Sequence, residues 1–296
     1  MSENTAVSIV IPTYNGAATI TTQLARLIPQ LLDGDEIIVA NNRSTDDTVR
    51  VVEELAKKDP RIRTVPAVAR QGINHARNTG IKHSHNQFIL FCDDDDAVAD
   101  TWVADMRDAL REWPVVGASR RFLTSGAGIE TTSETAQIFG FLYAPGNTLG
   151  AKRSVFEAIG GFDESFLRGH DEAELCIRAQ LAGIALGNAD TWVDYVQRPD
   201  AHSSLLQYFH YGRTSIQLWC RYRNSIAPGF VSFRHSLLAA LASLPTALVS
   251  WANMGNKVQA RSVGWRLGVA WGHLRYRIMG RPPKPLIARI DPLRTS

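Results

Sequence analysis

The sequence predicts an α/β fold in which a mostly parallel sheet is flanked by helices and followed by a helical C-terminal region. Short runs rich in β-branched residues alternate with stretches of helical spacing between residues 7 and 92. Short polar links join these segments, as expected when helices connect parallel strands. From residue 203 onward the pattern is mostly helical, with breaks at Pro228, Pro245 and Pro282.

The first half of the chain supports this fold element by element. Strands are expected at residues 7–11, 35–40, 61–66 and 87–92, and helices at residues 17–32, 46–58 and 72–83. Ser44 or Thr45 is expected to cap the second helix. After residue 97 the pattern loosens. Helices at 152–160 and 171–183 are the elements it predicts there before residue 200.

Composition and charge divide the chain into two regions. Of its 296 residues, 45% are hydrophobic and 21% are charged, which is typical of a folded protein. Residues 1–200 carry 19 Lys and Arg against 28 Asp and Glu, whereas residues 201–296 carry 13 against one. We therefore predict two domains with different tasks, residues 1–200 and residues 201–296.

The basic region 201–296 is expected to meet a partner surface. Its mostly apolar stretch at residues 237–251 is shorter than the ~20 residues that a membrane-spanning helix needs. Two interpretations stay open: a membrane interface with anionic headgroups, or a buried helical subdomain or homodimer interface. No recognition motif accompanies the charge, so nucleic acid is not an expected partner. The tryptophans of this region are Trp219, Trp251, Trp265 and Trp271.

The N-terminus and the cysteines bear on the compartment. Residues 1–6 lack the basic flank and apolar core of a secretion signal. The three cysteines are isolated and form no CxxC pair, so neither a disulfide framework nor a zinc site is predicted. We expect a cytoplasmic protein, peripheral at the inner face of the cell membrane if region 201–296 binds lipid.

An acidic run follows the fourth predicted strand. Asp93, Asp94, Asp95 and Asp96 come directly after the apolar residues 87–92. Carboxylates at a strand end can hold Mg²⁺ or Mn²⁺, which takes its other ligands from water and substrate phosphates. A bound cation would make a diphosphate a better leaving group. The alternative is a solvated acidic turn or helix start, which an acidic run alone favours.

Polar segments begin where three of the predicted strands end, at Pro12, Asn41 and Asp93. In parallel sheets, ligands bind outside the carboxyl ends of the strands. We therefore expect these three segments to converge on one site.

Six motifs together resemble the family 2 glycosyltransferases, which have the GT-A fold. The resemblance covers about residues 7–190, and the motifs occur in the family's order and spacing. They are residues 7–15 (VSIVIPTYN), 36–48 (EIIVANNRSTDDT), 72–80 (GINHARNTG), 91–96 (FCDDDD), 160–164 (GGFDE) and 171–178 (DEAELCIR).

The resemblance implies a role for each matched position. Glu172 matches the family's catalytic base, and Asp171 precedes it. Asp93 and Asp95 would bind the metal, with a late histidine, His202 or His210, completing the site. The positions implied in nucleotide binding are Pro12, Thr13, Tyr14, Asn41, Arg77, Asp93 and Asp94.

Simpler interpretations stay open for several of these residues. Glu172 could be a helix-start acid that favours the helix dipole. Arg77 could be a cation on a helix surface, and Tyr14 a core or turn aromatic. Asn41 could serve turn chemistry through its own side chain.

Two departures from the family pattern matter. Asn41 and Asn42 replace the usual Asp-Asp, and an amide can both accept and donate at a pyrimidine ring. A UDP- or dTDP-linked donor is therefore expected. The family's Glu-Asp pair is inverted here to Asp171-Glu172.

The resemblance implies a metal-dependent, inverting transfer of a sugar from a nucleotide diphosphate to a hydroxyl group. The expected acceptor is a cell-envelope glycan or lipid-linked saccharide. One competing hypothesis is a non-catalytic, membrane-tethered module that binds nucleotide sugars. Another is a sugar nucleotidyltransferase, which would need a Gly-rich basic loop after the first strand, unlike residues 12–16.

Overall fold

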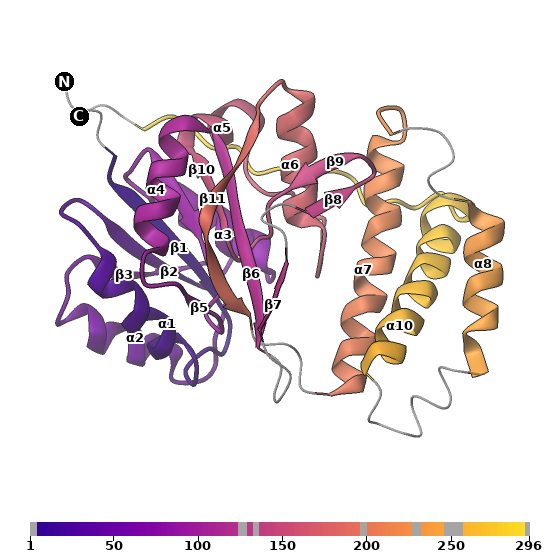
Figure 1. The fold of residues 1–296 in the computed structure, drawn as a ribbon, viewed down its shortest axis with the longest axis horizontal. Helices are drawn as coiled ribbons and strands as arrows, with labels where there is room; N and C mark the ends of the chain where they lie inside the picture. Colours follow the sequence, from indigo (N-terminus) through magenta and orange to yellow (C-terminus); the bar gives the residue numbers. More distant parts are fainter. Residues whose placement is uncertain are drawn as a thin grey trace. The chain divides into compact units, whose positions relative to one another are not determined.

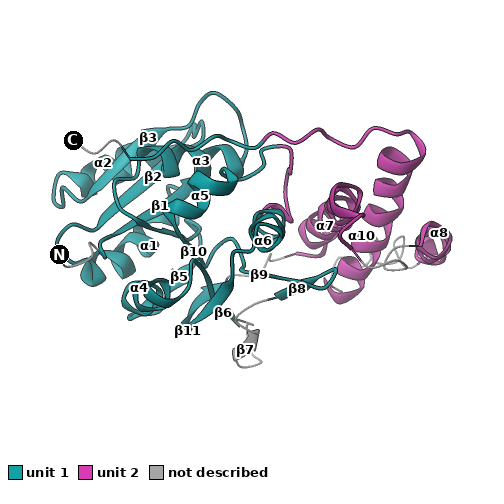
Figure 2. Cartoon of the chain, turned by 90° about the horizontal axis from the view of Figure 1, so that it is seen from above, with its two compact units in different colours: residues 1–164, 172–196, 287–296 teal, residues 165–171, 197–286 magenta. Residues whose placement is uncertain are grey.

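A computed structural model describes residues 5–123, 129–132, 136–195, 200–226, 232–245 and 257–293. The chain forms two compact units, which Figure 2 colours separately. Unit 1 comprises residues 1–164, 172–196 and 287–296, and unit 2 comprises residues 165–171 and 197–286. Whether a boundary at residue 200 separates two folding domains stays a prediction.

Unit 1 is built on a mixed sheet with the strand order β3-β2-β1-β4-β10-β6-β11-β5, and β7 pairs with β6. β3, β2, β1 and β4 are mutually parallel, β10 lies antiparallel between β4 and β6, and β6 is parallel to β11. The strands are β1 Val7–Thr13, β2 Glu36–Asn41, β3 Ile62–Pro66, β4 Phe88–Phe91, β5 Ala97–Val98, β6 Val115–Leu123, β7 Ile129–Thr132, β10 Leu149–Lys152 and β11 Leu186–Tyr195. A separate hairpin joins β8 (Ala136–Ile138) to β9 (Phe141–Tyr143).

Helices cover both faces of this sheet (Figure 1). Alternate residues of a strand point to opposite faces, so Ile9 and Ile11 enter one core and Val10 enters the other. The first core takes apolar residues of α1 (Ile20–Leu27), α2 (Thr48–Ala56) and α4 (Trp102–Glu112). The second takes residues of α3 (Ile73–His83), α5 (Arg153–Ile159) and α6 (Asp171–Leu181). The sheet is thus apolar on both sides, which confirms the predicted fold class.

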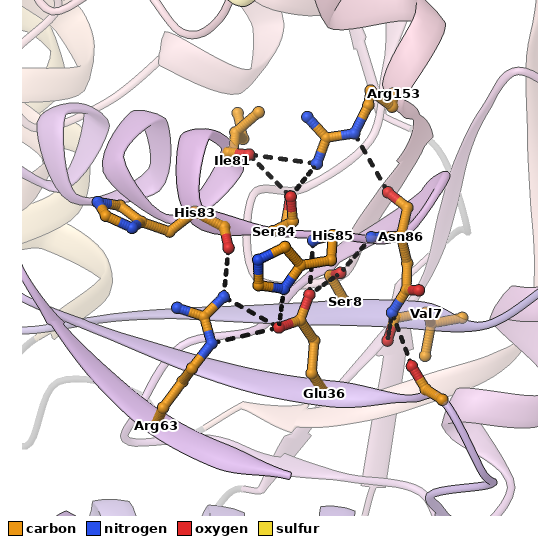
Figure 3. Close-up of polar contacts among 11 residues, drawn as sticks. Val7, Ser8, Glu36, Arg63, Ile81, His83, Ser84, His85, Asn86 and Arg153 are labelled. Atoms are coloured by element: carbon orange, nitrogen blue, oxygen red, sulfur yellow. Dashed lines mark hydrogen bonds and ion pairs between the residues drawn. The ribbon is translucent and has the colours of Figure 1, made fainter. Parts of the chain in front are cut away.

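Hydrogen bonds close the amino end of the parallel strands (Figure 3). Asn86 donates to the carbonyls of Val7 and Gly34 at 3.0 Å each, and buried Arg153 donates to the Ser84 carbonyl at 2.6 Å. Burial pushes up the pKa of Glu36, but hydrogen bonds from Ser8, the His85 backbone and Arg63 lower it overall. This end of the sheet is occupied by structural contacts, which leaves the carboxyl end for a ligand.

Unit 2 is helical and consists mainly of α7 (Ala201–Tyr222), α8 (Phe233–Ala242) and α10 (Lys257–Gly272), which continues into a π-helical turn at His273–Ile278. α7 and α10 approach each other closely: a Cβ on Gly268 would lie 2.0 Å from the carbonyl oxygen of Phe209. None of the helices in the described ranges has the length and apolar composition needed to cross a bilayer. Of the apolar stretch at residues 237–251, only residues 237–245 are described, and Trp251 and Pro228 lie outside the described residues.

The predicted elements agree with the structure in the first half of the chain and are incomplete after it. Each of the four predicted strands is present within about three residues of its expected bounds, as are α2 and α3. The helix expected at residues 17–32 is shorter, because α1 ends at Leu27 and a 3-10 turn follows at Ile28–Gln30. The expected cap at Ser44 or Thr45 is wrong. α2 begins at Thr48, whose N–H donates to Asp46 at 3.1 Å, while Ser44 instead accepts from the Asn15 backbone at 2.9 Å.

Candidate functional site

The candidate site lies at the carboxyl ends of β1, β2 and β4, where the polar segments converge as expected. The backbone N–H of Asn42, just after β2, donates to the Thr13 carbonyl at 2.8 Å. The Thr13 hydroxyl donates to the Asp94 carboxylate, just after β4. Gly16 lies against both groups, and a Cβ there would collide with Asp94 and Thr13. Hydrogen bonds therefore join the carboxyl ends of the three neighbouring strands β1, β2 and β4.

Three carboxylates form a cluster next to this junction. One oxygen each of Asp93, Asp95 and Asp96 can be chosen so that all three lie within 4.8 Å of one another. Asp95 is exposed and Asp93 partly so, whereas Asp96 is buried and accepts from the Asn147 amide at 2.6 Å. The sequence analysis predicted Asp93 and Asp95 as metal ligands but did not include Asp96. The signal for Asp96, its place in the same acidic run, was available.

The electrostatics of this cluster favour a cation. Burial, which is the largest cause, and the charges of Asp95 and Asp93 together raise the pKa of Asp94 to about 6, although the Thr13 hydroxyl lowers it. Burial and the charge of Asp93 also raise the pKa of Asp96 well above its ordinary value. Carboxylates held this close repel one another, and a divalent cation would relieve that repulsion. The all-oxygen donor set fits Mg²⁺ or Mn²⁺.

Arg77 belongs to this site and is not a surface cation. It comes from α3, and its side chain is 4% exposed. Its guanidinium lies 3.3 Å from an Asp93 carboxylate oxygen and 5.3 Å from the centre of the Phe162 ring. A Cβ on Gly146 would approach the guanidinium to 2.8 Å, so that glycine leaves room for it. The site therefore holds a fixed positive charge beside its carboxylates.

The predicted nucleotide-binding residues at the carboxyl ends of β1 and β2 differ in environment. Pro12 is buried in β1, whereas Tyr14 is 54% exposed. The Asn41 side chain accepts from the Ser44 backbone N–H at 3.1 Å, so it does stabilise the turn that follows β2. Asn42 donates to the carbonyls of Ala67 and Arg70, at 2.6 and 2.8 Å. Its side chain is thus committed to the β3–α3 link. The roles of Pro12, Thr13, Tyr14 and Asn41 in nucleotide binding stay predictions.

The Gly-Gly-Phe-Asp-Glu segment is fastened to α3. The Asn78 amide donates to the Phe162 carbonyl at 2.9 Å and accepts from the Phe162 N–H at 2.7 Å. Asn74 donates to the Asp163 carbonyl at 3.1 Å, and a His75 ring nitrogen lies 3.0 Å from the Glu164 carboxylate. The same helix that carries Arg77 therefore positions this loop.

The candidate base lies at the start of α6, on the chain just after the fastened loop. α6 begins at Asp171, which is buried, and Glu172 is partly exposed. Buried Glu174 pairs with Arg178 at 2.8 Å, and Arg178 donates to the Gly161 carbonyl at 2.8 Å. These contacts tie α6 to the Gly-Gly-Phe loop and so limit how Glu172 can move.

His202 lies in the first turn of α7, in unit 2. That turn is capped by Asp200, whose side chain accepts from the Ser203 N–H at 2.7 Å. The structure describes each unit by itself, so the proposed role of His202 as a metal ligand stays a prediction.

Comparisons with known proteins identify relatives of this chain. The sequence model described as Glycosyl transferase family 2 matches residues 8–163. A 99-residue stretch is 33% identical to a UDP-Glc:alpha-D-GlcNAc-diphosphoundecaprenol beta-1,3-glucosyltransferase of Escherichia coli, covering 33% of this chain and 37% of that protein. A 222-residue stretch is 28% identical to a probable glycosyltransferase of Bacillus subtilis, covering 68% and 52%. The chain thus spans about half or less of the length of these curated relatives.

Solved structures resemble the chain over most of its length. A mannosyltransferase from Pyrobaculum calidifontis, in complex with GDP-Man and Mn²⁺, matches with a TM-score of 0.64 at 17% identity, covering 92% of this chain and 87% of that one. Residues 1–349 of TarS from S. aureus, in complex with UDP-GlcNAc, match with a TM-score of 0.56 at 18% identity, covering 93% and 92%. These likenesses confirm the predicted GT-A fold.

Proposed function

The chain belongs to glycosyl transferase family 2, and from this membership we propose that it is a metal-dependent, inverting glycosyltransferase. It moves a sugar from a nucleotide diphosphate to a hydroxyl group of an acceptor. One observation supports this most directly: Arg77 and the carboxylates of Asp93, Asp95 and Asp96 lie together at the carboxyl ends of the parallel strands. That is where α/β sheets bind nucleotides.

The carboxylate cluster is the proposed place for Mn²⁺ or Mg²⁺. Asp93 and Asp95 would hold the cation, with Asp96 and His202 as further candidate ligands. When bound, such a cation offsets the charge of a diphosphate and stabilises it as a leaving group. Arg77 adds a fixed positive charge beside Asp93, and its guanidinium could bind a phosphate oxygen of the donor.

Glu172 is the proposed general base. The acceptor hydroxyl gives its proton to the Glu172 carboxylate as its oxygen attacks the anomeric carbon. Attack from the face opposite the diphosphate inverts that carbon. Asp171, at the preceding position, is buried at the helix start and supports the position of the base.

The donor base is proposed to be a pyrimidine. Asn41 stands at the position of the family's usual aspartate, at the end of β2, and its amide can pair with uracil or thymine. Its carbonyl oxygen already accepts from Ser44, which leaves the amide hydrogens for a carbonyl of the base. The Escherichia coli relative is named for UDP-Glc and the TarS structure contains UDP-GlcNAc, which favours a UDP-linked donor, although the mannosyltransferase structure contains GDP-Man.

A nucleotide screen and one variant test this function. Thermal shift with UDP, dTDP, GDP and their sugars should show stabilisation by a pyrimidine donor that is larger with Mn²⁺ than with EDTA. Glu172→Gln should lower the transfer rate by 10³-fold or more, on the order expected for a lost general base and nucleophile activation, while donor binding stays within about twofold. Transfer by Glu172→Gln at the wild-type rate would remove the assignment of the base. Binding without turnover in the wild type would instead favour the non-catalytic module.

The proposed acceptor is a lipid-linked saccharide reached at a membrane surface. The Escherichia coli relative is named for an acceptor linked to diphosphoundecaprenol. Residues 201–286 of this chain contain eleven Lys and Arg and no Asp or Glu. α8 also exposes a row of leucines at Leu237, Leu238 and Leu241, so cationic and apolar groups share one unit. A bilayer surface complements both features, because anionic headgroups attract the cations and the acyl region accepts the leucines.

Vesicle sedimentation tests the membrane contact. The wild-type protein should pellet with phosphatidylglycerol vesicles at low salt and less at 0.5 M salt, because surface charge is screened. Leu238→Ser combined with Leu241→Ser should reduce pelleting, whereas Leu32→Ser, which changes an exposed leucine of unit 1, should not. Equal pelleting of all three proteins would contradict the proposal. A loss of dimerisation in the α8 variant without any lipid effect would identify a homodimer interface instead.

A further inference from the structure

The segment just before the candidate base has an unusual backbone. Arg168, Gly169 and His170 all have positive φ angles, of 67°, 133° and 59°. Residues other than glycine rarely adopt this conformation. Arg168 and His170, which flank Gly169, must therefore be held in it by their surroundings. Such outliers are concentrated at functional sites. α6 and the candidate base Glu172 follow within two residues.

Contacts from α7 hold this segment in place. Arg213 donates to the Leu167 carbonyl at 2.9 Å. A Cβ on Gly169 would lie 2.5 Å from the Tyr211 ring, so the backbone packs directly on that side chain. A ring nitrogen of His170, Nδ1, lies 2.9 Å from the Thr214 hydroxyl. About one turn of α7, residues 211–214, thus contacts residues 167–170.

The hydrogen bond between His170 and Thr214 has a defined direction. The Thr214 hydroxyl donates its single hydrogen to the His210 carbonyl, at 2.8 Å. It must therefore accept from His170, which places the ring hydrogen on Nδ1. The ring also packs edge-on against Tyr211 and Trp265, with centroids 5.9 and 6.2 Å away. Burial lowers the pKa of His170 to about 4, which keeps the ring neutral in this setting.

We propose that His170 is a positioning residue for Glu172, fastened to Thr214 so that the left-handed segment aims the start of α6. The inference rests on the proposed function, because it assumes that Glu172 is the base. Unit 2 then affects the chemistry through the chain that leads from His170 to Glu172, and not through a contact with substrate. The contacts described above that hold residues 167–170 come from unit 2.

The geometry explains why this segment in particular matters. The chain direction at the first residue of a helix depends on the φ and ψ angles of the residue before it. His170 is that residue, and its left-handed backbone is compatible with few alternatives. If the His170 side chain loses its partner, the segment can relax toward ordinary angles and rotate Glu172. A displacement of about 1 Å can cost a base up to 10²-fold in rate.

Two neighbouring hydroxyls on α7 provide a matched test. Thr214 accepts from His170, whereas Ser215 donates to the Gly212 carbonyl of its own helix at 2.7 Å. Thr214→Val should lower kcat roughly tenfold or more with donor KM unchanged within twofold. Ser215→Ala should leave both constants near the wild type, and Thr214→Ser should restore kcat. Thermal unfolding of each variant verifies that it is folded.

Two further variants separate positioning from general stability. His170→Asn keeps an N–H donor near Nδ1 and tolerates a positive φ, so it should retain more activity than His170→Leu. In the Glu172→Gln background, Thr214→Val should cause no additional loss, because the misplaced group is already inactive.

The outcomes distinguish this inference from the proposed function. A Thr214→Val rate equal to that of Ser215→Ala, in an enzyme that Glu172→Gln inactivates, overturns the positioning role alone. So does a Thr214→Val loss that persists in full in the Glu172→Gln background. Absence of transfer by the wild type with every nucleotide sugar overturns both.

Discussion

Arg77 and Asn78 are neighbours in one helix and have different tasks. Arg77 places its charge beside Asp93, whereas Asn78 bonds both the N–H and the carbonyl of Phe162. The Asn78 amide imitates a neighbouring strand, because it satisfies two backbone groups that burial would otherwise leave unpaired. The presence of Asn78 in the motif is therefore explained by the folding of the chain, whereas that of Arg77 is explained by the candidate site.

We expect Asn78→Ala to destabilise the protein by about 2–3 kcal/mol, because it leaves the Phe162 N–H and carbonyl buried without partners. Thr79→Ala is the matched control: its hydroxyl donates to the His75 carbonyl of its own helix, and its loss should cost less than about 1 kcal/mol. Urea denaturation measures both. Equal stabilities of the two variants would show that the amide contacts contribute little.

At the scale of elements, the helices of unit 2 pack through glycine. Gly212 on α7 and Gly264 and Gly268 on α10 each face the backbone of the opposite helix. Side chains there would push the two helices apart. Glycine is a poor helix former, so its presence at these positions reflects the close approach and not local preference.

Gly268→Ala should destabilise unit 2 by roughly 1–3 kcal/mol, because the new methyl group meets the Phe209 carbonyl, which cannot rotate away. Helix propensity alone predicts the opposite sign, a gain of up to ~1 kcal/mol. Thermal denaturation followed by circular dichroism decides between them. Ser262→Ala, at an exposed position of the same helix, serves as the control and should be neutral or slightly stabilising.

At the scale of the whole molecule, charge is segregated along the chain. The carboxylates gather at the site of unit 1, where three lie within 4.8 Å. Between residues 201 and 286 the chain contains Lys and Arg but no Asp or Glu. The first arrangement favours a bound cation and the second an anionic surface. Both arrangements are destabilising without their partners, since like charges repel.

The Asp94 carboxyl makes this cost measurable as a pH dependence. Its pKa is raised to about 6 by burial, so the folded protein holds the proton more tightly than the unfolded chain. Stability at this position is therefore greatest below pH 4 and falls as the pH rises through 6. In EDTA, Asp94→Asn should raise the free energy of unfolding by about 2 kcal/mol at pH 7 and by nothing near pH 4. Urea denaturation at the two pH values checks this. A gain of the same size at both would exclude titration of Asp94 as the cause.

Sequence reasoning recovered the elements that local pattern specifies. β1, β2 and β4 are apolar runs buried on both faces, and these runs are visible without any structure. In β3 only Ile62 and Val65 are buried. α4 had a signal of the same kind, because Trp102, Met106 and Leu110 follow helical spacing, but the prediction did not use it. β10 had none: its four residues, LGAK, form a strand only because β4 and β6 lie on either side.

The sequence alone determined the α/β core, the order of its first elements and the polar segments that end its strands. These follow from side-chain periodicity and turn chemistry, which act between residues close in the chain. Tertiary structure decided which polar residues serve the site and which serve the fold. Asp96 joins the carboxylate cluster because Asn147, 51 residues away, donates to it, and Asn42 is held by the β3–α3 link. Contacts between residues distant in the chain set these assignments, and no local pattern encodes them.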